Sequence, residues 1–307
     1  TFTVPGMVAP QYAVQAGDAN AGYFLLPGCA ANNLDLSGGC IWNINKYNKI
    51  QPRTEGLNLS ARWTQNLFDG WQSALALSWF NSKAEQYRQS DAYSTGPITI
   101  PYTWVGSAGT LVDQTNPATS TMVLPANSLD NPFNPASPYY AAAQAYYGSS
   151  FASYVGQPAL LYAVLTDFPD QQIRFDTDVL RAVEDISGTL GGWDMHFGIG
   201  YVRDATRATY IGFARNSLLS AALANGSYRV GANAYLNPPS LYAQIAPVTH
   251  DTATSELGYV SANASRRVGQ LPGGPLGLAA GLEARYLRAN NPGEPYAASG
   301  DIIRTWP

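Results

Sequence analysis

The residues that could carry out chemistry in this chain are few. Its two histidines, His196 and His250, lie far apart, and His196 stands between Met195 and Phe197 in an alternating segment. The sequence contains no GxSxG, HExxH or GxxxxGKS/T motif, which are signatures of a serine nucleophile, a catalytic zinc and a phosphate-binding loop. We therefore expect no enzymatic activity, no cofactor and no metal site.

The only two cysteines, Cys29 and Cys40, lie in the segment GCAANNLDLSGGC. A bond between them would close a small loop rich in glycine and asparagine, and would stabilise it by restricting its unfolded state. Neither histidine is near the pair in the sequence, which disfavours a metal site. We expect a disulfide, and hence an oxidising compartment such as the periplasm or the cell exterior; the alternative is two unrelated thiols.

Aromatic side chains offer the best candidate for ligand binding. The segment SPYYAAAQAYYGSSFASY (137–154) begins with Ser137 and Pro138, which predict a helix start, and its tyrosines recur along one helical face. Tyrosine combines a large contact area with a polar group, which suits chelates, sugars and peptides. The alternative is that this helix packs its aromatic side chains against neighbouring loops. The candidate ligand-binding residues are Tyr102, Trp104, Tyr139, Tyr140, Tyr146, Tyr147, Phe151 and Tyr154.

The elements that would position these residues are β-hairpins. The segment LNLSARWTQNLFDGWQSALALSW (57–79) places a DG turn between two arms whose large apolar side chains recur at every second position. Side chains alternate between faces along a strand, so the pattern predicts a hairpin with one apolar face and one polar or small face. Two further segments repeat this pattern, although their first arms, 178–190 and 254–267, alternate less clearly and leave the register open. We predict hairpins near 57–82, 178–203 and 254–288.

Long irregular segments separate the hairpins and are rich in Tyr, Pro, Asn, Ser and Gly. Short turns at one end and long loops at the other are typical of outer-membrane β-barrels, whose turns are periplasmic and whose loops are extracellular. Inside one such segment, NSLLSAALANG (216–226) predicts a short helix capped by Asn216 and ended by Gly226. The predicted extracellular loops are 1–52, 88–172, 204–252 and 289–307.

The composition agrees with strands that face lipid. Charged residues make up 12% of the chain, about half the usual share in a soluble protein, yet no run of about 20 apolar residues predicts a spanning helix. Trp71 and Trp193 directly follow two turns, and Trp79, Tyr201 and Tyr286 lie far along the strands, as two interfacial aromatic girdles require. The net charge of −4 disfavours nucleic acid as a partner.

The opposite face of the hairpins consists mostly of Gly, Ala, Ser and Asn, which suits a water-filled or plugged lumen better than an exposed soluble surface. We expect its charged residues to face the lumen and to pair with a plug where one is present. Six strands are too few to close a bacterial barrel, which has at least eight. The sequence therefore predicts an all-β fold in which 1–307 form a partial domain, a transmembrane antiparallel β-barrel segment of about six strands. The predicted lumen-facing residues are Arg62, Asp194, His196, Glu283 and Arg285.

Four phrases together resemble the middle portion of the β-barrel of TonB-dependent outer-membrane receptors: CIWNINKYNKIQPRTEGLNLSARWT (40–64), LPANSLDNPFNP (124–135), SGTLGGWDMHFGIGYVR (187–203) and GPLGLAAGLEARYLRANNPGEPYAASGDI (274–302). The resemblance implies a 22-stranded barrel with an N-terminal plug domain in its lumen. We expect the plug, the TonB-box segment and the terminal strands to lie outside this sequence. The resemblance also implies a bacterial outer-membrane location, contact with outer-membrane lipid, and energised import of a siderophore, cobalamin, sugar or peptide by way of the plug and the TonB complex.

Two alternatives stay open at this point. A passive outer-membrane channel or an adhesin barrel would share the strand pattern but lack a plug. A secreted soluble β protein, carbohydrate-binding or hydrolytic, would bury the apolar face in a core instead of in lipid. For a membrane barrel, we expect Leu278→Arg to be destabilising by about 2–4 kcal/mol if Leu278 lies near the bilayer midplane.

Overall fold

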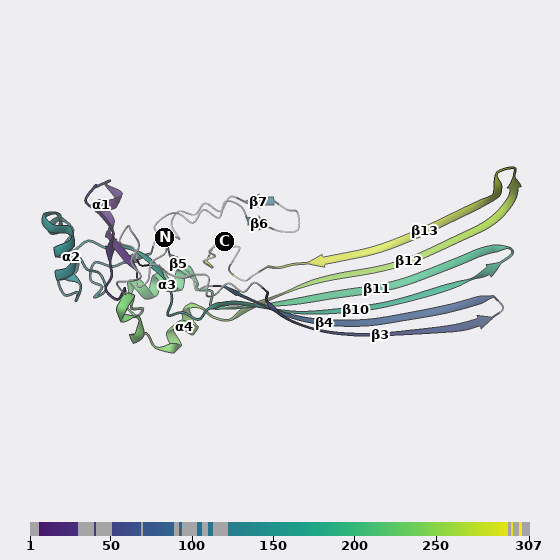
Figure 1. Ribbon diagram of the computed structural model, residues 1–307, viewed down its shortest axis with the longest axis horizontal. Helices are drawn as coiled ribbons and strands as arrows, with labels where there is room; N and C mark the ends of the chain where they lie inside the picture. Colours follow the sequence, from purple (N-terminus) through teal and green to yellow (C-terminus); the bar gives the residue numbers. More distant parts are fainter. Residues whose placement is uncertain are drawn as a thin grey trace.

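Six long antiparallel strands project from a compact region of short strands and helices (Figure 1). This computed structural model describes residues 6–29, 40, 51–68, 70–88, 92–93, 103–105, 110–112, 122–293, 296 and 301–302. Every strand pair within these residues is antiparallel. The prediction of a predominantly β, antiparallel chain is therefore confirmed.

The six long strands form one sheet. They are β3 (Arg53–Phe68), β4 (Trp71–Arg88), β10 (Gln171–Leu190), β11 (Trp193–Ile211), β12 (Thr249–Leu271) and β13 (Gly274–Asn290). Their order is β13-β12-β11-β10-β4-β3, and three hairpins, β3–β4, β10–β11 and β12–β13, supply them. Each hairpin extends further from its turn than the sequence predicts. Polar pairs such as Asp176 with Lys83 continue the ladder where apolar alternation has ended.

The three hairpin turns lie together at the end of the sheet that is farthest from the compact region (Figure 1). In two of these turns Gly70, Gly191 and Gly192 have φ angles of 75°, 58° and 78°. Glycine adopts this left-handed conformation without a steric cost, which is why tight hairpin turns favour it. Short turns thus occupy one end of the sheet, and the long connections occupy the other.

The long sheet is open. Among the described strands, β3 and β13 each pair on one side only, so they form the two edges and no closed barrel is present. The register shifts by one residue near two of the turns, between Asn66 and Phe68 and between Arg267 and Gly269. Such bulges bend and twist the strand that contains them.

Segments that the sequence assigns to loops build the compact region. Its strands are β1 (Met7–Pro10), β2 (Phe24–Leu25), β5 (Ala92–Tyr93), β8 (Val123–Leu124) and β9 (Ala159–Val164). Its helices are α1 (Gln11–Gln15), α2 (Tyr140–Tyr147), η3 (Gly148–Ser153), α3 (Asn216–Ala224), η4 (Gly231–Leu236) and α4 (Pro239–Ile245). The strands form a sheet in the order β2-β1-β9-β5, with β8 also beside β9, while β6 (Thr103–Val105) and β7 (Thr110–Val112) pair separately. One apolar core joins this sheet to α2, η3, α3 and α4.

Both predicted loop helices are present, but their ends differ from the prediction. The first, α2, begins at Tyr140, three residues after Ser137. The Ser137 hydroxyl accepts a hydrogen bond from the Tyr139 amide (3.2 Å) and donates one to the carbonyl of Leu129 (2.8 Å), so it orders the turn that precedes the helix. Gly148, with a φ angle of 57°, then ends α2, and the chain continues as the 3-10 helix η3. In the second, α3, Asn216 is the first helical residue rather than the cap.

Candidate functional site

The strand register divides the side chains of the long sheet between two faces. Directly opposed residues of antiparallel strands project to the same face, and here Leu59 opposes Trp79 while Trp63 opposes Leu75. Extending the register through β10, β11, β12 and β13 collects the large apolar side chains on one side. We call this the apolar face; its main residues are Leu59, Trp63, Trp71, Leu75, Leu77, Trp79, Leu180, Trp193, Phe197, Ile199, Tyr201, Val260, Leu278, Leu282 and Tyr286.

The apolar face is exposed in the structure. Trp63 and Leu282, from strands at the two edges of the sheet, are 69% and 68% exposed, and most of their apolar neighbours are exposed as well. Soluble monomers rarely expose contiguous apolar patches larger than a few hundred Å². A surface of this kind indicates contact with lipid or with another apolar body.

The apolar character of this face is confined to a band beside the turns. The band runs for nine residues from Trp71 to Trp79 in β4 and for nine from Trp193 to Tyr201 in β11, with an aromatic residue at each end. In β13 the corresponding stretch runs from Leu278 to Tyr286. A tilted strand crosses a bilayer with roughly 9–11 residues. The length of the band therefore matches a membrane crossing.

The same face becomes charged beyond the band, toward the compact region. The residues that continue it are Asn81, Lys83 and Glu85 in β4, Asp178 and Asp176 in β10, Arg203 and Arg207 in β11, Glu256 in β12 and Arg288 in β13. The long strands are thus about twice the length of the band, and their second halves have the surface of a solvated sheet.

Glu184 is the exception between the two ends of the band: among the described residues, no other acidic or basic side chain lies on the apolar face there, and Arg266, opposite Leu278, lies at the turn end. It opposes Leu75 on β4 and Ile199 on β11, and its carboxylate accepts a hydrogen bond from the Ser73 hydroxyl. Because Glu184 interrupts the apolar alternation of the 178–190 arm, sequence reasoning did not fix the register there. The pairing of β10 on both sides fixes it.

Within the band, the opposite face of the long sheet carries mostly polar and small side chains, and we call it the polar face; beyond the band it also carries Phe80, Leu257 and Leu287. It carries every charged residue that the sequence predicts to face a lumen, namely Arg62, Asp194, His196, Glu283 and Arg285. His196 Nε2 lies 3.4 Å from Asp185 Oδ1, and the Arg285 guanidinium donates a hydrogen bond to Glu283. Sequence reasoning missed Asp185, since it lies in the arm whose register was open.

Glycines on the polar face give room to side chains of the neighbouring strand. A Cβ atom at Gly200 would lie 2.1 Å from Cε1 of Tyr259, and one at Gly281 would lie 2.2 Å from Oδ1 of Asn263. Each glycine is therefore covered by the side chain opposite it, a packing device that secures strand register. The abundance of glycine on this face thus has a structural cause.

Most of the aromatic residues predicted to bind a ligand are part of the core of the compact region. Tyr139, Tyr147 and Tyr154 are buried, and their hydroxyl groups accept from Asn233 (3.0 Å), donate to the Gly22 carbonyl (2.6 Å) and donate to Asp18 Oδ2 (2.7 Å), respectively. Phe151 is buried among them. The structure therefore favours the packing alternative for these four residues.

Two of the remaining candidate ligand-binding residues are accessible to solvent. Tyr146 is 56% exposed, and Tyr140 is partly buried with its ring 4.9 Å from that of Phe151. Tyr102 lies outside the described residues, and for Trp104 the structure describes only the backbone, in β6. A ligand surface built from this segment would therefore use Tyr140 and Tyr146.

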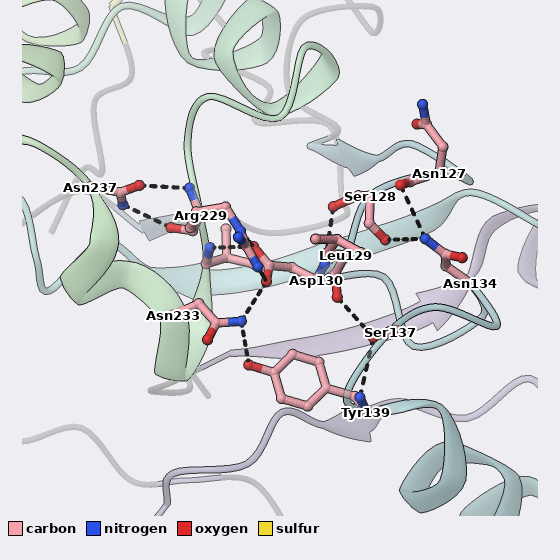
Figure 2. A network of polar contacts seen from close by, with 11 residues as sticks. Asn127, Ser128, Leu129, Asp130, Asn134, Ser137, Tyr139, Arg229, Asn233 and Asn237 are labelled. Carbon is pink, nitrogen blue, oxygen red and sulfur yellow. Dashed lines mark hydrogen bonds and ion pairs between the residues drawn. The ribbon is translucent and has the colours of Figure 1, made fainter.

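The phrase LPANSLDNPFNP (124–135) forms the polar centre of the compact region (Figure 2). Asp130, which is 1% exposed, accepts hydrogen bonds from Nε and Nη2 of Arg229 (2.8 and 2.7 Å), from the Val230 amide (3.0 Å) and from Asn233 (2.7 Å). Asn134 donates to the carbonyls of Asn127 (3.1 Å) and Ser128 (3.0 Å). The asparagines and the aspartate of this phrase therefore order the fold. Sequence reasoning did not identify Arg229 as the partner of Asp130, because 99 residues separate them.

A second carboxylate, Asp167, is held by neutral donors. It accepts hydrogen bonds from the hydroxyl groups of Tyr228 (3.0 Å) and Tyr242 (2.9 Å), and Asn237 lies 3.4 Å away. Burial raises the pKa of Asp167, although these hydrogen bonds act in the opposite direction. Burial together with the charge of Asp167 raises the pKa of Tyr242 to about 12. This cluster joins the segment after β9 to η4 and α4.

Asp301 supplies the cap that the first turn of α3 lacks from its own residues. Its carboxylate accepts hydrogen bonds from the Ser217 amide (2.7 Å) and hydroxyl (2.9 Å) and from Nε of Arg215 (2.8 Å). Burial alone would raise the pKa of Asp301, but the hydrogen bonds from Ser217 and Arg215 outweigh it and hold the pKa below its usual value. Residues 84 positions apart in the sequence are thereby joined.

Acidification is expected to release this cap. A carboxyl group whose pKa is lowered by folding stabilises the fold above its unfolded pKa, and the contribution is lost as the pH falls through the lower, folded value. For Asp301 the loss should occur below the ordinary value of 3.8. Hydrogen exchange of the Ser217 amide should show protection that falls in this range, and Asp301→Asn should reduce the protection at neutral pH by about 2 kcal/mol. Equal protection in both proteins would contradict this role.

Cys29 and Cys40 form a disulfide, as the sequence predicts, with their Cα atoms 5.9 Å apart. Within the described residues, no group of three or more His, Cys, Asp and Glu side chains could hold a metal ion. Over the same residues, no helix is long and apolar enough to cross a membrane. Comparisons with protein-family models, with curated proteins and with solved structures found no match to this chain.

Proposed function

We propose that the long sheet is a membrane-spanning part of an outer-membrane β-barrel, and that the chain belongs to a receptor that imports a scarce ligand with energy from the TonB complex. The observation that carries the membrane assignment is the nine-residue apolar band with aromatic residues at both ends and charged residues beyond it. Outer-membrane strands have this pattern: an apolar band about 25 Å tall between two aromatic girdles. The apolar face then contacts outer-membrane lipid.

In this arrangement the hairpin turns are periplasmic and the compact region is extracellular. The polar face lines the lumen, where Arg62, Asp194, His196, Glu283 and Arg285 contact water or the plug domain of the receptor. The edge strands β3 and β13 require further strands beside them, because unpaired backbone groups are costly in hydrocarbon. The four phrases that resemble TonB-dependent receptors support the plug and the 22-stranded barrel.

The ordered compact region supports a receptor rather than a simple pore. Long loops with their own hydrogen-bonded core are typical of binding surfaces held in a fixed shape. The ligand is one of the classes that such receptors import: a siderophore, cobalamin, a sugar or a peptide. No role for nucleic acid, no enzymatic step and no cofactor form part of the proposal.

Ligand uptake, compared between a strain that lacks the gene and its parent strain, tests this function. We expect the deletion to abolish uptake of one ligand among iron chelates, cobalamin, sugars and peptides, and we expect a proton uncoupler to abolish the same uptake in the parent strain. Uptake that survives the uncoupler would instead indicate a passive channel, and absence of the protein from the detergent-soluble outer-membrane fraction would indicate a secreted soluble protein.

Glu184 gives the membrane assignment a local test. A charged side chain near the bilayer midplane is costly, by somewhat less for Glu than the roughly 2–4 kcal/mol found for Arg and Lys. We therefore expect Glu184→Leu to raise the free energy of unfolding in lipid bilayers by up to about 2 kcal/mol. In a soluble protein the same change would enlarge an exposed apolar patch, so lower solubility without a gain in stability would count against the bilayer.

A further inference from the structure

A groove crosses the apolar face near the end of the band that is closer to the compact region. Its volume is about 570 Å³, and it extends from Leu75 on β4 to Tyr286 on β13. Small residues, Ala182, Gly258 and Ala284, alternate here with larger ones, which leaves the groove open between them. The space above Gly258 is empty: a Cβ atom placed there would meet no other atom within 4 Å.

Two arginines lie on the same face one step beyond the groove, toward the compact region. Arg203 and Arg288 flank Glu256 in the register of β11, β12 and β13, two residues beyond Tyr201 and Tyr286. Two residues of a strand span about 7 Å. Arg203 is half-exposed, with Nε 3.7 Å from the Glu256 carboxylate. At this level of the register the face carries two guanidinium groups and one carboxylate, and the next carboxylate, Asp178, lies one step further toward the compact region.

We propose that this groove and the two arginines bind one anionic phospholipid, whose phosphate charge is not balanced by a cationic group in the same headgroup. An acyl chain occupies the groove over Gly258, and the phosphate lies between Arg203 and Arg288. Guanidinium groups bind phosphate oxygens in pairs of charge-assisted hydrogen bonds, which favours a phosphate over an uncharged headgroup. Glu184 also lines the groove, on the side farther from the arginines. It is four residues along β10 from Leu180, which opposes Arg203, so about 13 Å of strand separates it from the level of the phosphate.

The proposal depends on the membrane orientation proposed above, but not on the imported ligand or on TonB. A lipid fits because its acyl chain and its charged headgroup are adjacent, as are the apolar groove and the pair of arginines on this face. The aromatic residues Tyr201 and Tyr286 separate them, at the depth where lipid headgroups meet acyl chains.

Native mass spectrometry of the full chain, released from bilayers of equal parts dioleoylphosphatidylglycerol and dioleoylphosphatidylcholine, tests the site. These lipids share their acyl chains and differ in headgroup charge. We expect one phosphatidylglycerol to be retained in preference to phosphatidylcholine, and we expect Arg203→Gln with Arg288→Gln to reduce that preference roughly tenfold. Gly258→Leu, which fills the groove without touching the arginines, should reduce retention of phosphatidylglycerol as well. Glycerol phosphate alone should not bind.

Arg181→Gln is the matched control, because Arg181 lies at the level of Val202 on the polar face. It should leave lipid retention unchanged. Equal retention of the two lipids, or a preference that survives the arginine changes or Gly258→Leu, would overturn the lipid site. If the chain inserts into bilayers and shows no preference, only this site is wrong; if it does not insert at all, the proposed membrane orientation fails with it.

Discussion

Replacing Leu282 by arginine is expected to lower the free energy of unfolding in a bilayer by about 2–4 kcal/mol. Leu282 lies at the middle of the band in β13, four residues from Leu278 and four from Tyr286, and is 68% exposed on the apolar face. In a bilayer this position is surrounded by acyl chains, which cannot solvate a guanidinium group. In water the same change would place a charged group on an exposed surface at almost no cost.

The measurement is reversible unfolding in lipid vesicles by denaturant, with two comparison variants in the same strand. Leu278 lies at the turn end of the band, opposite Arg266, and therefore near the interface rather than the midplane. At that depth the cost of Leu278→Arg falls to about 0–1 kcal/mol. Ala279→Arg projects to the polar face. A cost at Ala279 as large as that at Leu282 would show that the two faces do not have different surroundings.

Removing the Asp130 carboxylate is expected to destabilise the compact region by about 3–5 kcal/mol. Asp130→Ala would leave the Arg229 guanidinium, the Val230 amide and the Asn233 amide without their shared acceptor. The arginine side chain is only 24% exposed, so water replaces the lost partner incompletely. The compact region should therefore unfold at a lower urea concentration while the long strands remain folded in detergent.

Tyrosine near-ultraviolet circular dichroism would follow this unfolding, since the buried tyrosines lie in the same core. Asp170→Ala serves as the control, because Asp170 is exposed and a surface change of this kind should alter stability by no more than about 0.5 kcal/mol. If Asp130→Ala behaved like Asp170→Ala, the network in Figure 2 would not hold the compact region together.

The hairpins could be predicted from the sequence because their information is local. Alternation with a period of two and a glycine turn specify a hairpin without reference to the rest of the chain. The loop-side halves of the strands lack that signal: on β4, Lys83 and Glu85 lie on the same face as Trp79 but are charged. Their strand structure depends on neighbours supplied by distant hairpins.

The compact region could not be predicted, because its contacts join residues far apart in the sequence. Arg229 meets Asp130 across 99 residues, and Asp301 meets Ser217 across 84. Tyrosine adds a further ambiguity, since its apolar ring suits a core and its hydroxyl suits a surface. Tyr154, 1% exposed, and Tyr146, 56% exposed, belong to the same sequence pattern. Only the position of the other segments distinguishes them.

Spin-label accessibility along β13 tests the central assignment most directly. Single cysteines at 278 through 286, each carrying a nitroxide in a chain whose native disulfide is intact, would be compared in bilayers for collisions with oxygen and with a water-soluble nickel complex. The apolar face predicts high oxygen accessibility at 278, 280, 282, 284 and 286, greatest at 282, and low values at the positions between them. High accessibility to the nickel complex at 280, 282 and 284 would place this face in water and contradict the membrane assignment.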